Sequence, residues 1–144
     1  MSTSVVFLAI LAIGFSVSEA KVFERCEFAH QLLKYGVPKS QIPTWTCIAR
    51  HESEFDTSKI NHDTGDHGIL QISQIYWCTE SGGPGKACKK TCADFRNDYL
   101  GDDIECAKTI YNEHQRLSGN GFNAWVVFKT HCSGDNSKFV EGCF

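Results

Sequence analysis

The chain of 144 residues has only 3 prolines, no internal repeat and no low-complexity linker. Without a linker-like stretch, one folded domain is expected. No basic block is present either, because 14 Lys and Arg are spread along a chain that also carries 17 Asp and Glu. This near-neutral, slightly acidic balance gives little electrostatic support for nucleic-acid binding, and we predict no nucleic-acid partner.

The chain has a single long apolar run, at its N-terminus. Residues 5–15 are apolar, and the segment closes on Ser18-Glu19-Ala20, a small-residue pattern that a signal peptidase cuts. The run is too short to span a bilayer comfortably, and no second run follows it. We therefore predict a signal peptide over residues 1–20 and a secreted, monomeric domain over residues 21–144 with no membrane anchor.

All eight cysteines follow the predicted cut. An even number in a chain bound for an oxidising compartment predicts four disulfides, which sequence alone does not pair. The alternative is a metal site built on Cys88-x-x-x-Cys92 and nearby histidines, but a second closely spaced ligand pair is missing. The cysteines are Cys26, Cys47, Cys78, Cys88, Cys92, Cys106, Cys132 and Cys143.

Apolar residues recur at helical spacing in several segments. The first lies within residues 21–38, the second runs from Pro43 through Glu52, and the third covers residues 102–117. A shorter helix is expected within residues 121–132, after a Gly-Asn-Gly break.

Between the second and third predicted helices the composition changes. Residues 56–73 are rich in Asp, Asn, Thr and Gly and then turn apolar, as expected for a hairpin followed by a strand. Residues 79–91 contain Gly-Gly-Pro-Gly and predict an irregular loop. Helices, a small inserted sheet and helices again indicate the α+β class.

Glu52 lies on the apolar side of the second predicted helix. Trp45, Ile48 and Ala49 precede it at helical spacing, so they share its face. Burial disfavours the carboxylate anion and raises its pKa, and a carboxyl partly protonated near neutrality can act as a general acid. The alternative is that Glu52 lies at a frayed helix end and points to water.

Cleavage of a glycoside needs a second carboxylate that stays ionised. Asp66 is the best candidate, because it lies in a polar, glycine-flanked stretch just before the predicted strand, where hydration and hydrogen bonds favour the charged form. Asp63 and Asp56 are rivals that spacing does not exclude, and most aspartates in such loops only form turns.

Several separated motifs resemble the C-type lysozyme family, of the kind that insects secrete: KVFERCE, WTCIARHESEF, DHGILQIS, YWC, CAKTI, GFNAWV and GCF. The match covers essentially all of residues 21–144, with the cysteines in the family's order. It implies a lysozyme-like fold, in which a helical lobe and a small antiparallel β-sheet lobe enclose the active-site cleft. The implied disulfides are Cys26–Cys143, Cys47–Cys132, Cys78–Cys92 and Cys88–Cys106.

The resemblance also implies an activity, the retaining hydrolysis of the β-1,4 bond between N-acetylmuramic acid and N-acetylglucosamine in peptidoglycan, for antibacterial defence or digestion. Peptidoglycan or a chitooligosaccharide would be the substrate. Glu52 takes the general-acid position, Asp66 that of the nucleophile or cation stabiliser, and Trp125 is the ring expected against Glu52. The implied sugar-binding residues are Gln71, Ser73, Tyr76, Trp77, Ser118, Asn120, Ala124 and Trp125. Without the resemblance, the three aromatic residues would be assigned to the core.

Three departures from the family pattern bear on the chemistry. The hairpin before Asp66 is short, His67 replaces the tyrosine that usually follows the catalytic aspartate, and Ser73 replaces an asparagine. They bear on the efficiency of catalysis. The alternative function, which some relatives have, is that of a catalytically weak or inactive glycan-binding or regulatory member. Because such members usually lose one or both acids and this chain retains both, catalysis is the leading prediction.

Two groups of residues suggest metal ligands. Asn97, Asp102 and Asp103 resemble part of the calcium loop of some relatives, including α-lactalbumin, although acids at a helix start also serve as caps. Four hairpin residues could form a cluster, although a polar hairpin of turn residues and exposed imidazoles explains them without a metal. We predict no metal and no cofactor. The hairpin residues are His62, Asp63, Asp66 and His67.

Overall fold

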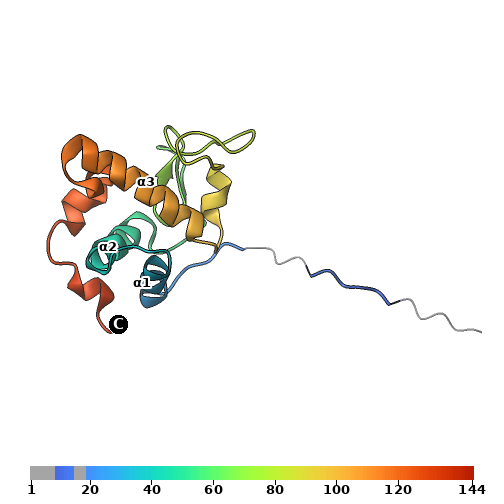
Figure 1. Cartoon of the computed structure of the whole chain (residues 1–144), viewed down its shortest axis with the longest axis horizontal. Helices are drawn as coiled ribbons and strands as arrows, with labels where there is room; N and C mark the ends of the chain where they lie inside the picture. The colour runs from blue at the N-terminus through green and yellow to red at the C-terminus, as the bar shows by residue number, and fades with distance from the viewer. Residues whose placement is uncertain (1–8, 15–18) are drawn as a thin grey trace, which may run out of the picture.

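The computed structural model describes residues 9–14 and 19–144, so residues 1–8 and 15–18 of the predicted signal peptide lie outside the described residues. The main helices lie together, and the small sheet lies at one end of the domain, on the opposite side of α2 from the C-terminus (Figure 1). This arrangement confirms the α+β class. Within the described ranges, no helix combines the length and the apolar character needed to cross a bilayer.

The three principal helices are α1 (Arg25–Lys34), α2 (Ile42–Ser53) and α3 (Gly101–Ser118). Each lies where the apolar spacing predicts it. α2 carries a proline in its first turn, where a missing N–H costs little, and α3 ends on Gly119 at φ 78°, a backbone conformation that favours glycine.

The short elements differ from the prediction. Residues 121–132 form two turns, η3 (Gly121–Ala124) and the π-helical η4 (Phe128–Cys132), where a single helix was expected. The reason is Trp125, whose extended backbone separates them and whose indole N–H donates to the Leu70 carbonyl at 2.9 Å. The remaining turns are η1 (Lys39–Gln41), η2 (Cys92–Arg96) and η5 (Ser137–Val140).

The sheet has three antiparallel strands of two residues each, β1 (Ile60–Asn61), β2 (Asp66–His67) and β3 (Ile72–Ser73), in the order β1-β2-β3. In the register, Asp66 pairs with Asn61 on one side and with Ser73 on the other. Gly68 follows β2 at φ 78°, and a Cβ there would lie 2.0 Å from the carbonyl oxygen of Phe95. Only glycine lets this end of the sheet pack so closely against η2.

One core joins the helices to the sheet. Trp45 of α2 packs edge-on against Trp125, with ring centroids 4.8 Å apart, and both side chains are buried. Such perpendicular aromatic pairs are favourable beyond their buried area. The tryptophan pair therefore lies in the same core that supports the apolar face of α2.

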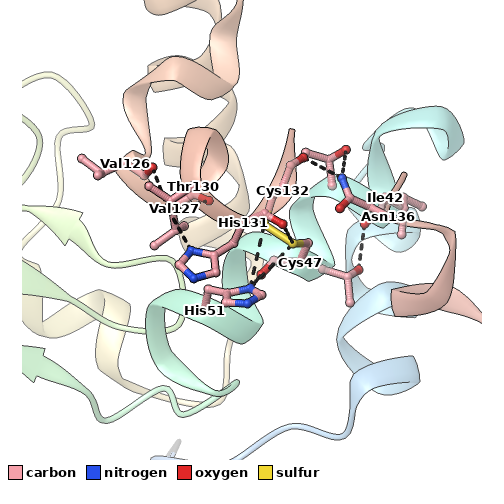
Figure 2. The surroundings of a disulfide bond; sticks show 11 residues. Ile42, Cys47, His51, Val126, Val127, Thr130, His131, Cys132 and Asn136 are labelled. Atoms are coloured by element: carbon pink, nitrogen blue, oxygen red, sulfur yellow. Dashed lines mark hydrogen bonds between the residues drawn. A yellow bond between two sulfur atoms is a disulfide. The ribbon is translucent and has the colours of Figure 1, made fainter. Parts of the chain in front are cut away.

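All eight cysteines are paired, and the four pairings are those that the family resemblance implies. The alternative of a metal site on Cys88 and Cys92 is therefore wrong. Figure 2 shows the Cys47–Cys132 bond joining α2 to η4. Beside it, the imidazoles of His51 and His131 are stacked with centroids 4.3 Å apart.

The first residues after the predicted cut belong to the fold. The backbone N–H of Lys21 donates to the hydroxyl of Thr57 at 2.8 Å, and the N–H of Thr57 donates to the Lys21 carbonyl at 2.9 Å. Thr57 is fully buried. This pair of hydrogen bonds ties the start of the domain to the segment between α2 and β1.

Candidate active site

A cavity of about 430 Å³ lies where α2, the sheet, α3 and the segment after η3 meet. Its position confirms the cleft between a helical lobe and a sheet lobe. The lining residues are Glu52, Thr64, Asp66, Gln71, Ile72, Ser73, Tyr76, Trp77, Ile110, His114, Ala124, Trp125, Val126 and Val127.

Glu52 enters this cavity from the last turn of α2 and is half-buried. Its pKa is raised from 4.5 to about 7, chiefly because burial disfavours the anion and then because Asp66 is negative; the cation of Lys59 partly opposes this. The alternative of a water-facing Glu52 at a frayed helix end does not describe this structure. The side chain can therefore hold a proton near neutral pH.

Asp66 enters the same cavity from β2. One of its carboxylate oxygens accepts a hydrogen bond from the Thr64 hydroxyl at 2.7 Å, which restricts the position of the side chain. Neither rival lines the cavity, and Asp56 instead caps a turn by accepting from the N–H and the hydroxyl of Ser58. The geometry therefore favours Asp66 as the second carboxylate.

Six of the eight predicted sugar-binding residues line the cavity, Gln71, Ser73, Tyr76, Trp77, Ala124 and Trp125. Tyr76 is 66% exposed, so its ring is available to a sugar. The amide of Gln71 donates to the carbonyls of Lys59 and Gly68, and it therefore also holds the hairpin. Trp125 has two roles in the same way, since it belongs to the core and also lines the cavity.

The other two, Ser118 and Asn120, do not line the cavity. The Ser118 hydroxyl donates to the carbonyl of His114 at 2.9 Å, and the Asn120 side chain caps η3 by accepting from the Phe122 N–H. Their contact with sugar stays a prediction. A second hollow, of about 610 Å³, shares Tyr76, Trp77 and His114 with the first and continues along α3.

Sequence reasoning missed several lining residues, among them Thr64, His114 and Val126. The Thr-Gly-Asp spacing could have indicated the hydroxyl that bonds Asp66, because side chains two residues apart often meet in turns. His114 lies in the third predicted helix, in which the sequence indicated no catalytic or sugar-binding residue. Val126 is 78% exposed in the cavity wall, and no pattern in the sequence marks it.

Ser73 and His67, the two replaced family residues, use their side chains inside the sheet lobe. The Ser73 hydroxyl accepts from the N–H of Ile75 at 3.2 Å. The His67 imidazole is 2% exposed, so the expectation of an exposed ring is wrong. Its nitrogens contact Gln74, Glu80 and Arg96, not the other members of the suggested hairpin cluster.

Two groups of possible metal ligands occur within the described ranges, and each includes a cysteine that is bonded in a disulfide. Such a sulfur is not a thiolate and is a poor ligand. The suggested hairpin cluster is not among these groups.

The calcium-loop residues have mixed contacts. The Asn97 side chain accepts from the N–H of Tyr99, and Asp102 accepts from the N–H of Asp103, as turn and helix-start residues do. Asp103 is completely buried, and neither of its carboxylate oxygens has a hydrogen-bond partner among the described residues. Burial and then the neighbouring Asp102 raise its pKa well above the usual value, because an uncompensated charge is costly in the interior.

Comparison with known proteins decides the family. The model of the C-type lysozyme/alpha-lactalbumin family matches residues 21–143. The chain belongs to this family. Lysozyme c-1 of Anopheles gambiae is 42% identical over 144 residues, and the match covers 98% of this chain and 97% of that protein. A lysozyme of Bombyx mori is 39% identical over 130 residues, and the match covers 88% of each chain. The crystal structure of a lysozyme from Litopenaeus vannamei superposes with a TM-score of 0.77 at 36% identity, covering 86% of this chain and 98% of that one.

These relationships make the chain a glycoside hydrolase of the lysozyme type. The relatives span nearly the whole domain at high identity, and the carboxylates described above lie in the cleft of the shared fold.

Proposed function

We propose that this lysozyme-family member is a secreted, monomeric muramidase. It hydrolyses the β-1,4 bond between N-acetylmuramic acid and N-acetylglucosamine in peptidoglycan with retention at the anomeric carbon, in antibacterial defence or in digestion of bacteria. The observation that carries the proposal is the pair of acids in one cavity, of which Glu52 has a pKa raised to about 7.

The two carboxyls divide the chemistry. Glu52, protonated near neutral pH, donates its proton to the glycosidic oxygen as the bond breaks. Asp66, held by the Thr64 hydroxyl, is placed to attack the anomeric carbon or to stabilise its positive charge. Glu52, now an anion, then takes a proton from the water that completes the hydrolysis. Lysozyme is itself the standard example of this division of roles, set by an apolar environment for one acid and a polar one for the other.

The cavity wall fits a chain of sugar rings. Tyr76 and Trp77 present aromatic surface, which suits the apolar faces of sugars, and Val126 adds an exposed aliphatic side chain to the cavity wall. The adjoining hollow gives room for further sugar units beyond Trp77. The proposed reaction uses only groups of this chain and needs no cofactor.

The proposal is tested by clearing of bacterial cell walls between acidic and neutral pH, with the Glu52→Gln variant as control. Clearing by the wild type and none by the variant supports the enzyme. Mass spectrometry of reduced fragments then identifies the bond, because a muramidase leaves N-acetylmuramic acid at the new reducing ends. NMR of the first-formed product reports retention or inversion. Binding of chitooligosaccharide without clearing at any pH would instead support the non-catalytic alternative.

A further inference from the structure

His67, directly after Asp66 on β2, makes polar contacts with three other segments. Its Nδ1 lies 2.8 Å from Nη1 of Arg96 in η2, and its Nε2 lies 2.9 Å from Oε1 of Gln74 and 2.8 Å from Oε1 of Glu80. The ring is almost completely buried. Buried polar contacts of this kind restrict side-chain position strongly, because breaking one leaves a partner unsatisfied.

The partners define the hydrogen positions on the ring. A guanidinium only donates, so Nδ1 must accept from Arg96, which leaves the single ring proton on Nε2. That proton is donated toward the Gln74 amide oxygen and the Glu80 carboxylate, both acceptors. The neutral imidazole thus satisfies a cation on one side and an anion on the other.

Gln74 holds the chain on both sides of Asp66. Its backbone N–H donates to the carbonyl of Gly65 at 2.8 Å, and its side chain contacts His67. A Cβ on Gly65 would lie 2.6 Å from the Gln74 side chain, so the two segments are closely packed. The residue between these two attachment points is Asp66.

We propose that His67 is a positioning residue, which clamps β2 between Arg96 and Glu80 so that Asp66 faces the cavity. Successive side chains of a strand point to opposite faces, so fixing His67 on one face fixes the direction of Asp66 on the other. This inference rests on the role proposed above for Asp66. The tyrosine usual at this position carries one hydroxyl and could not replace both ring nitrogens.

The test measures kcat and KM on soluble peptidoglycan glycan strands for His67→Leu, Arg96→Met and His67→Gln. His67→Leu removes both sides of the clamp and Arg96→Met removes one, whereas His67→Gln supplies one acceptor and one donor and should restore it. We expect His67→Leu and Arg96→Met to lower kcat about tenfold or more, since small misplacements of a reacting group are costly. KM should change by less than about twofold, because the sugar-binding wall is kept, and His67→Gln should recover most of kcat.

Thr57→Val is the matched control, because it removes a buried side-chain acceptor near the sheet outside the clamp. Its kcat should stay within about twofold of wild type at a temperature where all variants are folded. Equal losses of kcat in Thr57→Val, His67→Leu and Arg96→Met would overturn the clamp, as would a loss confined to KM. If His67→Leu does not fold, Arg96→Met and His67→Gln decide by the same criteria.

Asp66→Asn separates failure of the clamp from failure of the proposed function. An inactive Asp66→Asn together with unchanged clamp variants would overturn the clamp alone. A fully active Asp66→Asn would overturn the assignment of the second carboxylate, and with it the residue that the clamp is proposed to position.

Discussion

Asp66 and Glu52 enter one cavity from different lobes, and the negative charge of Asp66 adds to burial in raising the pKa of Glu52 to about 7. Burial and this neighbour together favour the protonated form of Glu52 at pH values where an isolated glutamate is charged. The effect on Glu52 can be measured in several ways.

Glu52→Gln should abolish activity and stabilise the fold at neutral pH. The pKa of Glu52 is about 7 in the folded protein against a reference value of 4.5, so the folded protein binds this proton more tightly than the unfolded chain does. The stabilisation of the fold by the bound proton is fully present below pH 4.5 and is lost as the pH rises to 7. For a fully buried carboxyl with this pKa shift, ionisation would lower the free energy of unfolding by about 3 kcal/mol. Solvent screening of the half-buried side chain reduces the gain expected from Gln to about 1–2 kcal/mol. Urea unfolding of both proteins at pH 4 and pH 8 measures it, and an unchanged difference between these pH values would contradict the raised pKa.

Lys59→Met should move the alkaline limb of the activity profile to higher pH. The lysine cation lowers the pKa of Glu52, so its removal keeps Glu52 protonated to a higher pH. The pH dependence of kcat/KM for the free enzyme reports this limb. Lys138→Met, a change outside the cavity, is the control for altered net charge. A limb that moves equally in both variants would mean that Lys59 has no specific effect.

Asp66→Asn should lose most activity, by about a hundredfold or more, because removing a charge that stabilises the transition state is costly. It should also lower the pKa of Glu52, since the negative neighbour is gone, and an NMR titration of the Glu52 carboxyl carbon measures that shift. Asp63→Asn is the matched control and should keep activity. Inactivation by the Asp63 change and not by the Asp66 change would reverse the assignment.

Asp103→Asn should make stability less dependent on pH. The raised pKa of the buried carboxyl means that the folded protein keeps a proton that the unfolded chain releases above about pH 4, so the wild type loses stability as pH rises. The variant lacks this loss. Thermal unfolding between pH 4 and pH 7 in the presence of EDTA compares the two proteins. A repeat with excess calcium tests the prediction of no cofactor, which a large calcium-dependent rise in the wild-type melting temperature would contradict.

The helices could be predicted because their signals are periodic, whereas the cleft was implied by the family resemblance. The stripe through Trp45, Ile48 and Ala49 identifies the buried face of α2, and Glu52 at the next position on it is half-buried with a raised pKa. The sheet was expected from turn-forming composition. Its strands are only two residues long, however, so alternation could not define their register.

The remaining features depend on contacts between distant parts of the chain. The break between η3 and η4 arises because Trp125 bonds Leu70, which is 55 residues away in the sequence. The burial of His67 depends on Arg96 and Glu80, and neither lies near it in a recognisable pattern. Disulfide pairing likewise followed from the family's order, since spacing alone leaves many pairings open.

If the chain is cut after residue 20 as predicted, the contact between Lys21 and Thr57 would involve the new N-terminus. Removal of residues 1–20 would convert the Lys21 amide into a free α-amino group. Its protonated form has three N–H donors near the buried Thr57 hydroxyl, whereas the amide of the precursor has one. A recombinant product that begins with an additional methionine or a tag remnant would lack this terminal ammonium. Preparations intended for stability measurements should therefore begin at Lys21 itself.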